Sequence, residues 1–320
     1  MKLGVMAALL GGMKLDDALD YCAKVGLDAI ELPLGPYPGD PWKLAGITRD
    51  KRCLADLKRK LAARGLEVSA IAAHGNPVHP HKRIAQAHHQ MHRQAVLLAA
   101  ELGGVVVNFS GCPGGAPGDQ TPNFITAPWP EEFLAASRYQ WDKVLIPYWK
   151  KESQFAARCG VKIAFEAHPN FTVHNPEDIV RLRDAVGKNL GANLDPSHFF
   201  WQGIDPVEAA RYLGENRCIF HVHAKDTAID PRNSRTFGNL DTKSYGDIRH
   251  RSWVFRTVGY GHGEEFWKPF VSMLRAYGYD GVLSIEHEDA LMSVNEGFEK
   301  AVAYLKGILI RQQAGKAWWF

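Results

Sequence analysis

Short apolar runs alternate with helical stretches along the 320 residues of the chain. The apolar runs span residues 2–6, 27–33, 67–74, 104–111, 161–169, 190–198, 218–226 and 281–289. In most of the stretches between them, apolar residues recur at the spacing of one helix face. Eight strands that alternate with helices favour a closed (β/α)8 TIM barrel, an α/β fold, over an open doubly wound sheet. We therefore expect residues 1–320 to form a single barrel domain.

Two long irregular segments interrupt this alternation. Residues 111–130 follow the fourth run and are rich in Gly and Pro, and residues 227–262 follow the seventh run without any helical period. Both segments follow strands, so both emerge at the carboxyl ends of the strands in a barrel. We expect them to cover the mouth of the barrel. The long helical stretch 131–160 contains Pro147, which predicts a break or a kink near residues 146–149.

Acidic residues and histidines end four consecutive strands in the second half of the chain. These strands end in the motifs FEAHP, NLDPSH, HVHAKD and IEHED. The carboxyl ends of barrel strands meet at one mouth, so we expect their Glu166, Asp195, His223 and Glu286 to lie together. Three carboxylates and one imidazole form a ligand set that suits Mn²⁺, Mg²⁺ or Co²⁺. It is less typical of a zinc centre, which is often rich in thiolates. We predict one divalent metal ion at these four residues, with Mn²⁺ as the first choice.

Other polar and aromatic residues are candidates for contacting a substrate at this mouth. The predicted substrate contacts are His198, His74, His168, Trp129 and Arg256. His198 follows the aspartate of NLDPSH by three residues, and His74 ends the third strand. His221 and His223 are two residues apart on one strand, so both are expected to face the barrel interior.

The remaining histidines and tryptophans are weaker candidates for a functional site. A group of histidines occupies a loop and a polar helix, and we expect it to face solvent rather than bind metal: His79, His81, His88, His89 and His92. His262 either lines the mouth or caps a loop. Trp129, Trp141, Trp149, Trp201 and Trp253 either stack on a sugar or an aglycone or pack within the fold, and packing is the commoner role for tryptophan.

Composition excludes several classes of function. The formal net charge is only +3, and the basic residues are scattered, so a nucleic-acid groove is not indicated. Five cysteines without a CxxC pair indicate neither a disulfide framework nor a structural zinc site, and they fit a reducing cytoplasm. No apolar stretch approaches the roughly 20 residues that cross a bilayer, and the N-terminal apolar run reads as the first strand. We expect a cytoplasmic protein without membrane or nucleic-acid partners.

The strand-end motifs resemble those of the xylose isomerase-like barrel superfamily. This sugar phosphate isomerase/epimerase group includes D-tagatose 3-epimerase, hydroxypyruvate isomerase, inosose dehydratase, the barrel subunit of carbon-glycoside deglycosidases and endonuclease IV. The resemblance covers essentially the whole chain and is most specific in FEAHP, NLDPSH, HVHAKD and YDGVLSIEHED. It implies that Glu166, Asp195, His223 and Glu286 bind one divalent ion.

The resemblance also implies roles in chemistry. Glu166 and Glu286 are expected to exchange protons with the substrate, and His198 is expected to contact a substrate oxygen. Thr172 and Ile229 stand where the ketose epimerases of this group have a glutamate and an arginine. These two differences argue against an ordinary ketohexose as the substrate.

The leading expectation is a divalent-metal-dependent isomerase or epimerase of a keto sugar or sugar derivative. It would abstract a proton next to a carbonyl and pass through a metal-stabilised enediolate. The alternative is a lyase that performs β-elimination on a 3-oxo sugar or glycoside, such as a carbon-glycoside deglycosidase barrel subunit. An endonuclease IV-like phosphodiesterase is a remote alternative because it needs three metals and a basic groove, and the intact ligand set argues against a noncatalytic binding protein. We expect a small carbohydrate substrate and a homo-oligomer, with a smaller partner subunit as an alternative assembly.

Overall fold

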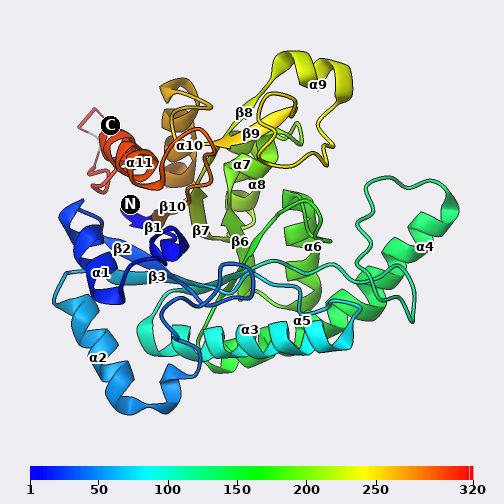
Figure 1. The fold of residues 1–320 in the computed structure, drawn as a ribbon, viewed down its shortest axis with the longest axis horizontal. Helices are drawn as coiled ribbons and strands as arrows, with labels where there is room; N and C mark the ends of the chain where they lie inside the picture. Colours follow the sequence, from blue (N-terminus) through cyan, green and yellow to red (C-terminus); the bar gives the residue numbers. More distant parts are fainter. Residues whose placement is uncertain (317, 320) are drawn as a thin grey trace.

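Eight parallel strands form a nearly closed barrel in the computed structural model, which describes residues 1–316 and 318–319 (Figure 1). In chain order the strands are β1 (Lys2–Val5), β2 (Ala29–Pro33), β3 (Glu67–Ala72), β4 (Val105–Asn108), β5 (Ile163–Glu166), β6 (Leu190–Leu194), β7 (Ile219–Ala224) and β10 (Val282–Ile285). Their spatial order is β1-β10-β7-β6-β5-β4-β3-β2. The edge strands β1 and β2 meet through a bridge between Met6 and Glu31. The expected (β/α)8 TIM barrel is confirmed.

Helices connect the strands and cover the outside of the barrel (Figure 1). The longer helices are α1 (Leu15–Lys24), α2 (Lys51–Ala62), α3 (Lys82–Leu102), α4 (Glu131–Tyr139), α5 (Ile146–Arg158), α6 (Pro176–Val186), α8 (Pro206–Glu215), α10 (Glu264–Ala276) and α11 (Val294–Ile308). Among the described residues, no helix is long and apolar enough to cross a membrane. Figure 1 shows both chain termini beside α11, on the same side of the barrel.

Local sequence signals explain where these helices begin and end. Asn175 caps α6, because its side-chain oxygen accepts from the backbone N–H of Asp178 at 2.9 Å, and Pro176 occupies the first turn. Gly26 follows α1 with φ of +75°, a left-handed conformation that a side chain would strain. Both boundaries therefore follow from the residue types at the helix ends.

The helical path does not break near Pro147, but its winding changes just before this residue. A π-helical segment, Gln140–Leu145, joins α4 to α5, and the N–H of Ile146 bonds the carbonyl of Trp141 five residues earlier. Pro147 lies in the first turn of α5, where its missing N–H costs little. The stretch 131–160 is therefore one helical path with a change of winding at its centre.

The two irregular segments differ from each other. Residues 111–130 contain no helix or strand, as expected. Residues 227–262 were expected to lack regular structure, and this expectation is wrong: β8 (Asp226–Ile229) pairs antiparallel with β9 (Trp253–Arg256), and α9 (Pro231–Phe237) lies between them. The two strands lie far apart in the chain, and local periodicity does not reveal such a pairing. Figure 1 shows the hairpin and α9 extending from one end of the barrel.

Candidate metal centre

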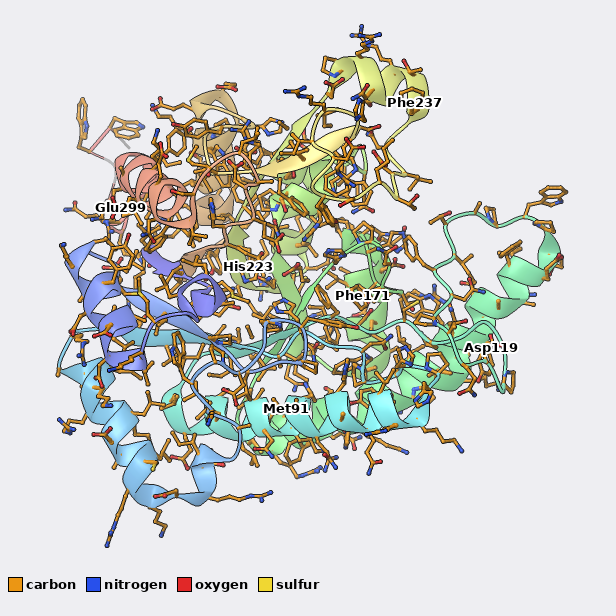
Figure 2. The ribbon with its side chains drawn as sticks, in the orientation of Figure 1. Met91, Asp119, Phe171, His223, Phe237 and Glu299 are labelled. Carbon is orange, nitrogen blue, oxygen red and sulfur yellow. The ribbon has the colours of Figure 1, made fainter. Side chains whose placement is uncertain are left out.

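Polar side chains of neighbouring strands lie in register inside the barrel. Glu166 of β5 pairs with Asn193 of β6, Asn193 pairs with His221 of β7, and His223 pairs with Ser284 of β10. Residues in register on adjacent parallel strands point to the same side of the sheet. A layer of polar groups therefore forms near the carboxyl ends of these strands, and Figure 2 labels His223 near its centre.

The four predicted metal ligands converge in this layer. One ligand atom from each of Glu166, Asp195, His223 and Glu286 lies within 4.8 Å of the others. Nδ1 of His223 is 3.1 Å from an oxygen of Glu166 and 3.1 Å from an oxygen of Glu286. Three of the side chains are buried, and that of Glu286 retains 14% exposure. The four groups can thus share one small ion.

Within the part of the chain that the structure describes, two buried atoms of this cluster lack a hydrogen-bond partner, which a bound cation would replace. Nδ1 of His223 and Oδ2 of Asp195 are buried without a hydrogen-bond partner of acceptable geometry among the described residues. Buried polar atoms in proteins are almost always satisfied, so such atoms call for an explanation. Carboxylate oxygens and one imidazole form a donor set suited to Mg²⁺, Mn²⁺ or Zn²⁺. The residues present therefore fit a divalent ion.

Glu166 is the most heavily contacted carboxylate of the cluster. Its Oε2 accepts from Asn193 Nδ2 and lies 3.1 Å from His74 Nε2, and its Oε1 lies 3.0 Å from His198 Nε2. Burial alone would raise its pKa, but the charge of His74 and the nearby imidazoles of His198 and His223 hold the pKa well below its usual range. Glu166 is therefore a fixed carboxylate.

Asp195 precedes the short helix α7 (Pro196–Phe200), which follows β6, and His198 lies within this helix. Oδ1 of Asp195 caps this helix by accepting from the N–H of Ser197 at 2.8 Å, so its Oδ2 is turned toward the cluster. Nε2 of His198 lies 3.3 Å from that oxygen. Burial disfavours the charged imidazole, but the Asp195 carboxylate outweighs it and raises the pKa of His198 to about 9.

Lys225 is a site residue that sequence reasoning missed. Its Nζ lies 2.8 Å from Glu286, 3.2 Å from Asp195 and 3.2 Å from Glu288, and only 2% of its side chain is exposed. Burial opposes the ammonium charge, but the carboxylates of Asp195 and Glu286 raise its pKa well above the usual value. Burial alone would raise the pKa of the Glu286 carboxyl, but the charges of Lys225 and His223 outweigh it and lower this pKa to about 2. The signal was its place two residues after His223, on the same face of the strand.

Glu31 of β2 is a second residue that sequence reasoning missed. It is fully buried, and its Oε2 lies 2.9 Å from His223 Nε2 and accepts from Ser284 Oγ at 2.8 Å. Burial opposes the charged imidazole of His223, but Glu31 and Glu286 raise its pKa well above the usual value. With Nε2 engaged by Glu31, Nδ1 is the atom of His223 that remains for a metal ion. The available signal was one carboxylate inside the otherwise apolar strand AIELP.

A hydrogen-bond chain through Asn193 and His221 also supports this cluster. Asn193 donates its amide N–H to Glu166, so its carbonyl oxygen faces His221 Nδ1 at 3.0 Å. His221 must therefore carry its proton on Nδ1. Burial lowers the pKa of His221 to about 4, which keeps the ring neutral, and its Nε2 faces Glu31 at 3.8 Å.

A cavity of about 340 Å³ opens onto this cluster. Glu166, Glu286 and Lys225 line it, together with His74 and His168. Nδ1 of His168 donates to the carbonyl of Pro169, and burial lowers its pKa to about 3, so a neutral imidazole faces the cavity. A small polar molecule in the cavity would thus meet carboxylates, an ammonium and two imidazoles.

Similarity to known proteins agrees with this fold. A profile of the xylose isomerase-like TIM barrel family matches residues 19–308. The chain belongs to this family. The uncharacterized protein YfiH of Bacillus subtilis is 38% identical over 311 residues, which cover 96% of this chain and 98% of YfiH. Inosose dehydratase of Clostridium botulinum is 30% identical over 139 residues, or 43% of this chain and 44% of that protein.

Solved structures share the xylose isomerase-like barrel at low sequence identity, which speaks to the fold alone. The probable 3-DHS dehydratase AsbF of Bacillus anthracis has a TM-score of 0.65 at 16% identity and covers 96% of this chain and 99% of its own. The zinc-bound IolI protein has a TM-score of 0.64 at 22% identity, with 98% and 100% coverage. The 3-keto-D-glucoside 4-epimerase YcjR of E. coli has a TM-score of 0.64 at 15% identity, with 96% and 99% coverage.

Only some of the predicted substrate contacts reach the cavity of this xylose isomerase-like barrel. His74 and His168 reach the cavity. His198 lies behind Glu166 and is fully buried. Trp129 is 80% exposed and does not line the cavity, and Arg256 bonds Asp289 through Nε at 3.0 Å instead of reaching the cavity. The structure therefore brings two of the five to the cavity surface.

The remaining histidines do not form a metal site among the described residues. His262 bonds Asp226 at 2.9 Å and stacks on Phe200 with ring centroids 3.7 Å apart, so it caps a loop. His92 was expected to face solvent, and this is wrong: it is fully buried and its Nδ1 pairs with Asn108 Nδ2 at 3.2 Å. His92 lies on the same face of α3 as the buried Val96 and therefore packs against the barrel.

Four of the five tryptophans considered from the sequence are packed within the fold. Trp141, Trp149, Trp201 and Trp253 are all buried, and Trp201 stacks on Trp253 with ring centroids 4.4 Å apart. The expectation that both irregular segments cover the mouth holds for one of them. Residues 227–262 contribute to a cavity wall beside the metal centre, whereas residues 111–130 line neither that wall nor the 340 Å³ cavity.

Proposed function

We propose that this protein is a divalent-metal-dependent enzyme that isomerises or epimerises a keto sugar or sugar derivative. The observation that carries the proposal is the convergence of Glu166, Asp195, His223 and Glu286 at the floor of a polar cavity. A divalent cation bound there, Mn²⁺ by preference, would polarise a substrate carbonyl and stabilise the negative charge left by proton removal. The names of the solved relatives, which include an epimerase, support the same class of chemistry.

Glu286 is the proposed base. It lines the cavity and remains partly exposed, whereas Glu166 is held by three neighbouring side chains. A base must reach the substrate proton and move with it, which favours the less constrained carboxylate. Isomerisation would need only Glu286, which would return the proton that it removed to the neighbouring carbon. Epimerisation would need a second proton donor on the opposite face of the same carbon, and Glu166 could serve only after releasing a contact and taking up a proton from a neighbouring imidazole such as His198.

The other cavity residues are proposed to position the substrate. His168 presents a neutral imidazole, which suits hydrogen bonding to a sugar hydroxyl. His74 bonds Glu166 and lines the cavity, so it can orient both that carboxylate and a substrate oxygen. Lys225 offers its ammonium beside Glu286 and can hold a substrate oxygen against the base.

A second candidate function is a lyase that eliminates a β-substituent from a 3-oxo sugar or glycoside. Lys225 favours it, because a buried ammonium 2.8 Å from the proposed base can donate a proton to a departing oxygen. The dehydratase names of one curated relative and one solved relative are consistent with this chemistry.

One assay separates the two candidates. Protein freed of metal with EDTA and then loaded with Mn²⁺ is incubated with a panel of ketoses and 3-oxo glycosides, and products are identified by NMR. Metal-dependent formation of an isomer or epimer supports the proposal, and release of water or an aglycone supports the lyase. Conversion that is unaffected by metal removal would contradict both.

A further inference from the structure

A second and larger cavity adjoins the one at the metal centre. Its volume is about 510 Å³. Tyr37, Phe109, His168 and Glu288 line both cavities, so the two spaces meet at these residues. A ligand whose polar end lies at the metal centre can therefore extend into the second cavity.

Aromatic rings form much of the wall of this second cavity. Phe109 and Phe171 stack with centroids 4.1 Å apart and planes 15° apart, and Tyr37 is tilted against both rings. Tyr245 stacks on Phe255 at 5.8 Å and 18°. The first group of rings comes from the loops that follow β2, β4 and β5, and the second comes from the insertion that follows β7. Two separate parts of the chain thus supply flat apolar surfaces to one space.

Few polar groups reach this space. Apart from the phenol hydroxyls of Tyr37 and Tyr245, the polar side chains that line it among the described residues are His168 and Glu288, at the junction with the first cavity. A sugar ring here would lose water from its hydroxyls without gaining matching hydrogen bonds, which is costly. A flat apolar ring loses little hydration and gains stacking contacts. The chemistry of the wall therefore selects an aromatic group.

We propose that the second cavity is a subsite for an uncharged aromatic aglycone, so that the substrate is an aryl glycoside of an oxidised sugar. This inference rests on the proposed function, because the sugar is placed at the metal centre and the aglycone follows from its position. The volume lies within the range of cavities that hold drug-sized ligands, so more than one ring can enter. Glu288 at the junction disfavours an anionic aglycone.

The test measures binding and does not depend on turnover. Dissociation constants of the Mn²⁺-loaded full chain are measured calorimetrically for phenyl and methyl β-D-glucopyranoside, which differ only in the aglycone. Phenyl and methyl β-D-galactopyranoside provide a second pair with another sugar configuration. Burial of the phenyl ring is expected to tighten binding by roughly tenfold or more over the methyl glycoside in at least one pair.

Two variants and a control locate the effect. Tyr245→Ala removes an aromatic wall, and Ala290→Trp fills the cavity from an exposed position. Each is expected to abolish most of the phenyl preference while leaving the methyl glycoside unchanged. Phe237→Ala is the matched control, because Phe237 is 64% exposed on α9 of the same insertion and lies far from Phe171 in Figure 2.

The outcomes separate this inference from the proposed function. Equal affinity for phenyl and methyl glycosides in both pairs, or a phenyl preference that survives both cavity variants, would overturn the aromatic subsite. Neither result bears on whether the metal centre exchanges protons with a sugar. A phenyl preference that both cavity variants remove and the Phe237 control retains establishes the subsite even if the protein converts no sugar.

Discussion

Oε2 of Glu31 lies 2.9 Å from Nε2 of His223, although the two residues are 192 positions apart in the chain. The barrel brings β2 and β7 together across its interior, and this contact orients the imidazole so that Nδ1 faces Glu166 and Glu286. A carboxylate behind a metal-bound histidine fixes the ring and increases its basicity. Glu31 therefore supports the proposed metal centre without touching the ion.

Glu31→Gln is expected to weaken Mn²⁺ binding by about tenfold, because the amide keeps the shape of the side chain but removes its charge. Competition with a fluorescent chelator measures the affinity. Glu299→Gln is the matched control, since Glu299 lies on the outer surface of α11 (Figure 2) and bonds Tyr21. An unchanged affinity in the Glu31 variant would show that the contact is structural only.

Lys225→Met is expected to have opposite effects on metal binding and on catalysis. The ammonium neutralises Asp195 and Glu286, so its removal should tighten Mn²⁺ binding by about tenfold or more. Turnover should fall by a similar factor or more, because the variant loses the group proposed to hold a substrate oxygen. Lys58→Met, at an exposed pair with Glu101, should change neither quantity. Weaker metal binding in Lys225→Met would contradict this account.

His92 is expected to make the fold sensitive to acid. Burial lowers its folded-state pKa to about 4, while an unfolded histidine has a pKa of about 6.5. Because the folded value is depressed, the unfolded chain binds more protons between these values, and stability falls as the pH drops below about 6.5. His92→Gln should reduce the loss of unfolding free energy between about pH 7 and pH 5 by roughly 1 to 2 kcal/mol. Urea unfolding at the two pH values measures this, and an unchanged loss would refute it.

The barrel and the convergence of the four candidate metal ligands could be predicted because both depend on local patterns. Each strand carries its own apolar run, and each candidate ligand lies at or just beyond the carboxyl end of its strand, as Glu166 ends β5 after Phe165. Phe165 packs outward against Trp149 while Glu166 points inward, which is the alternation that a strand imposes. Parallel topology then places all strand ends at one mouth, so no long-range information was needed.

The features that were missed depend on contacts between distant parts of the chain. Glu31 looks like an isolated acid in an apolar strand until closure of the barrel places it against His223. Lys225 reads as an ordinary strand-end lysine until three carboxylates surround it. The pairing of β8 with β9 joins the two ends of the insertion, and a short run such as Trp253–Arg256 does not by itself indicate its partner strand.

Solvent deuterium exchange tests the central claim most directly. Mn²⁺-loaded protein is incubated in D₂O with each ketose or 3-oxo glycoside that it converts, and the recovered sugar is analysed by NMR and mass spectrometry. If Glu286 removes the proton next to the carbonyl, the sugar gains deuterium at that carbon or its neighbour, and Glu286→Gln slows the exchange by about a hundredfold or more while retaining most of the metal affinity. Conversion of a substrate without any solvent deuterium at either carbon would contradict proton abstraction and indicate a hydride shift.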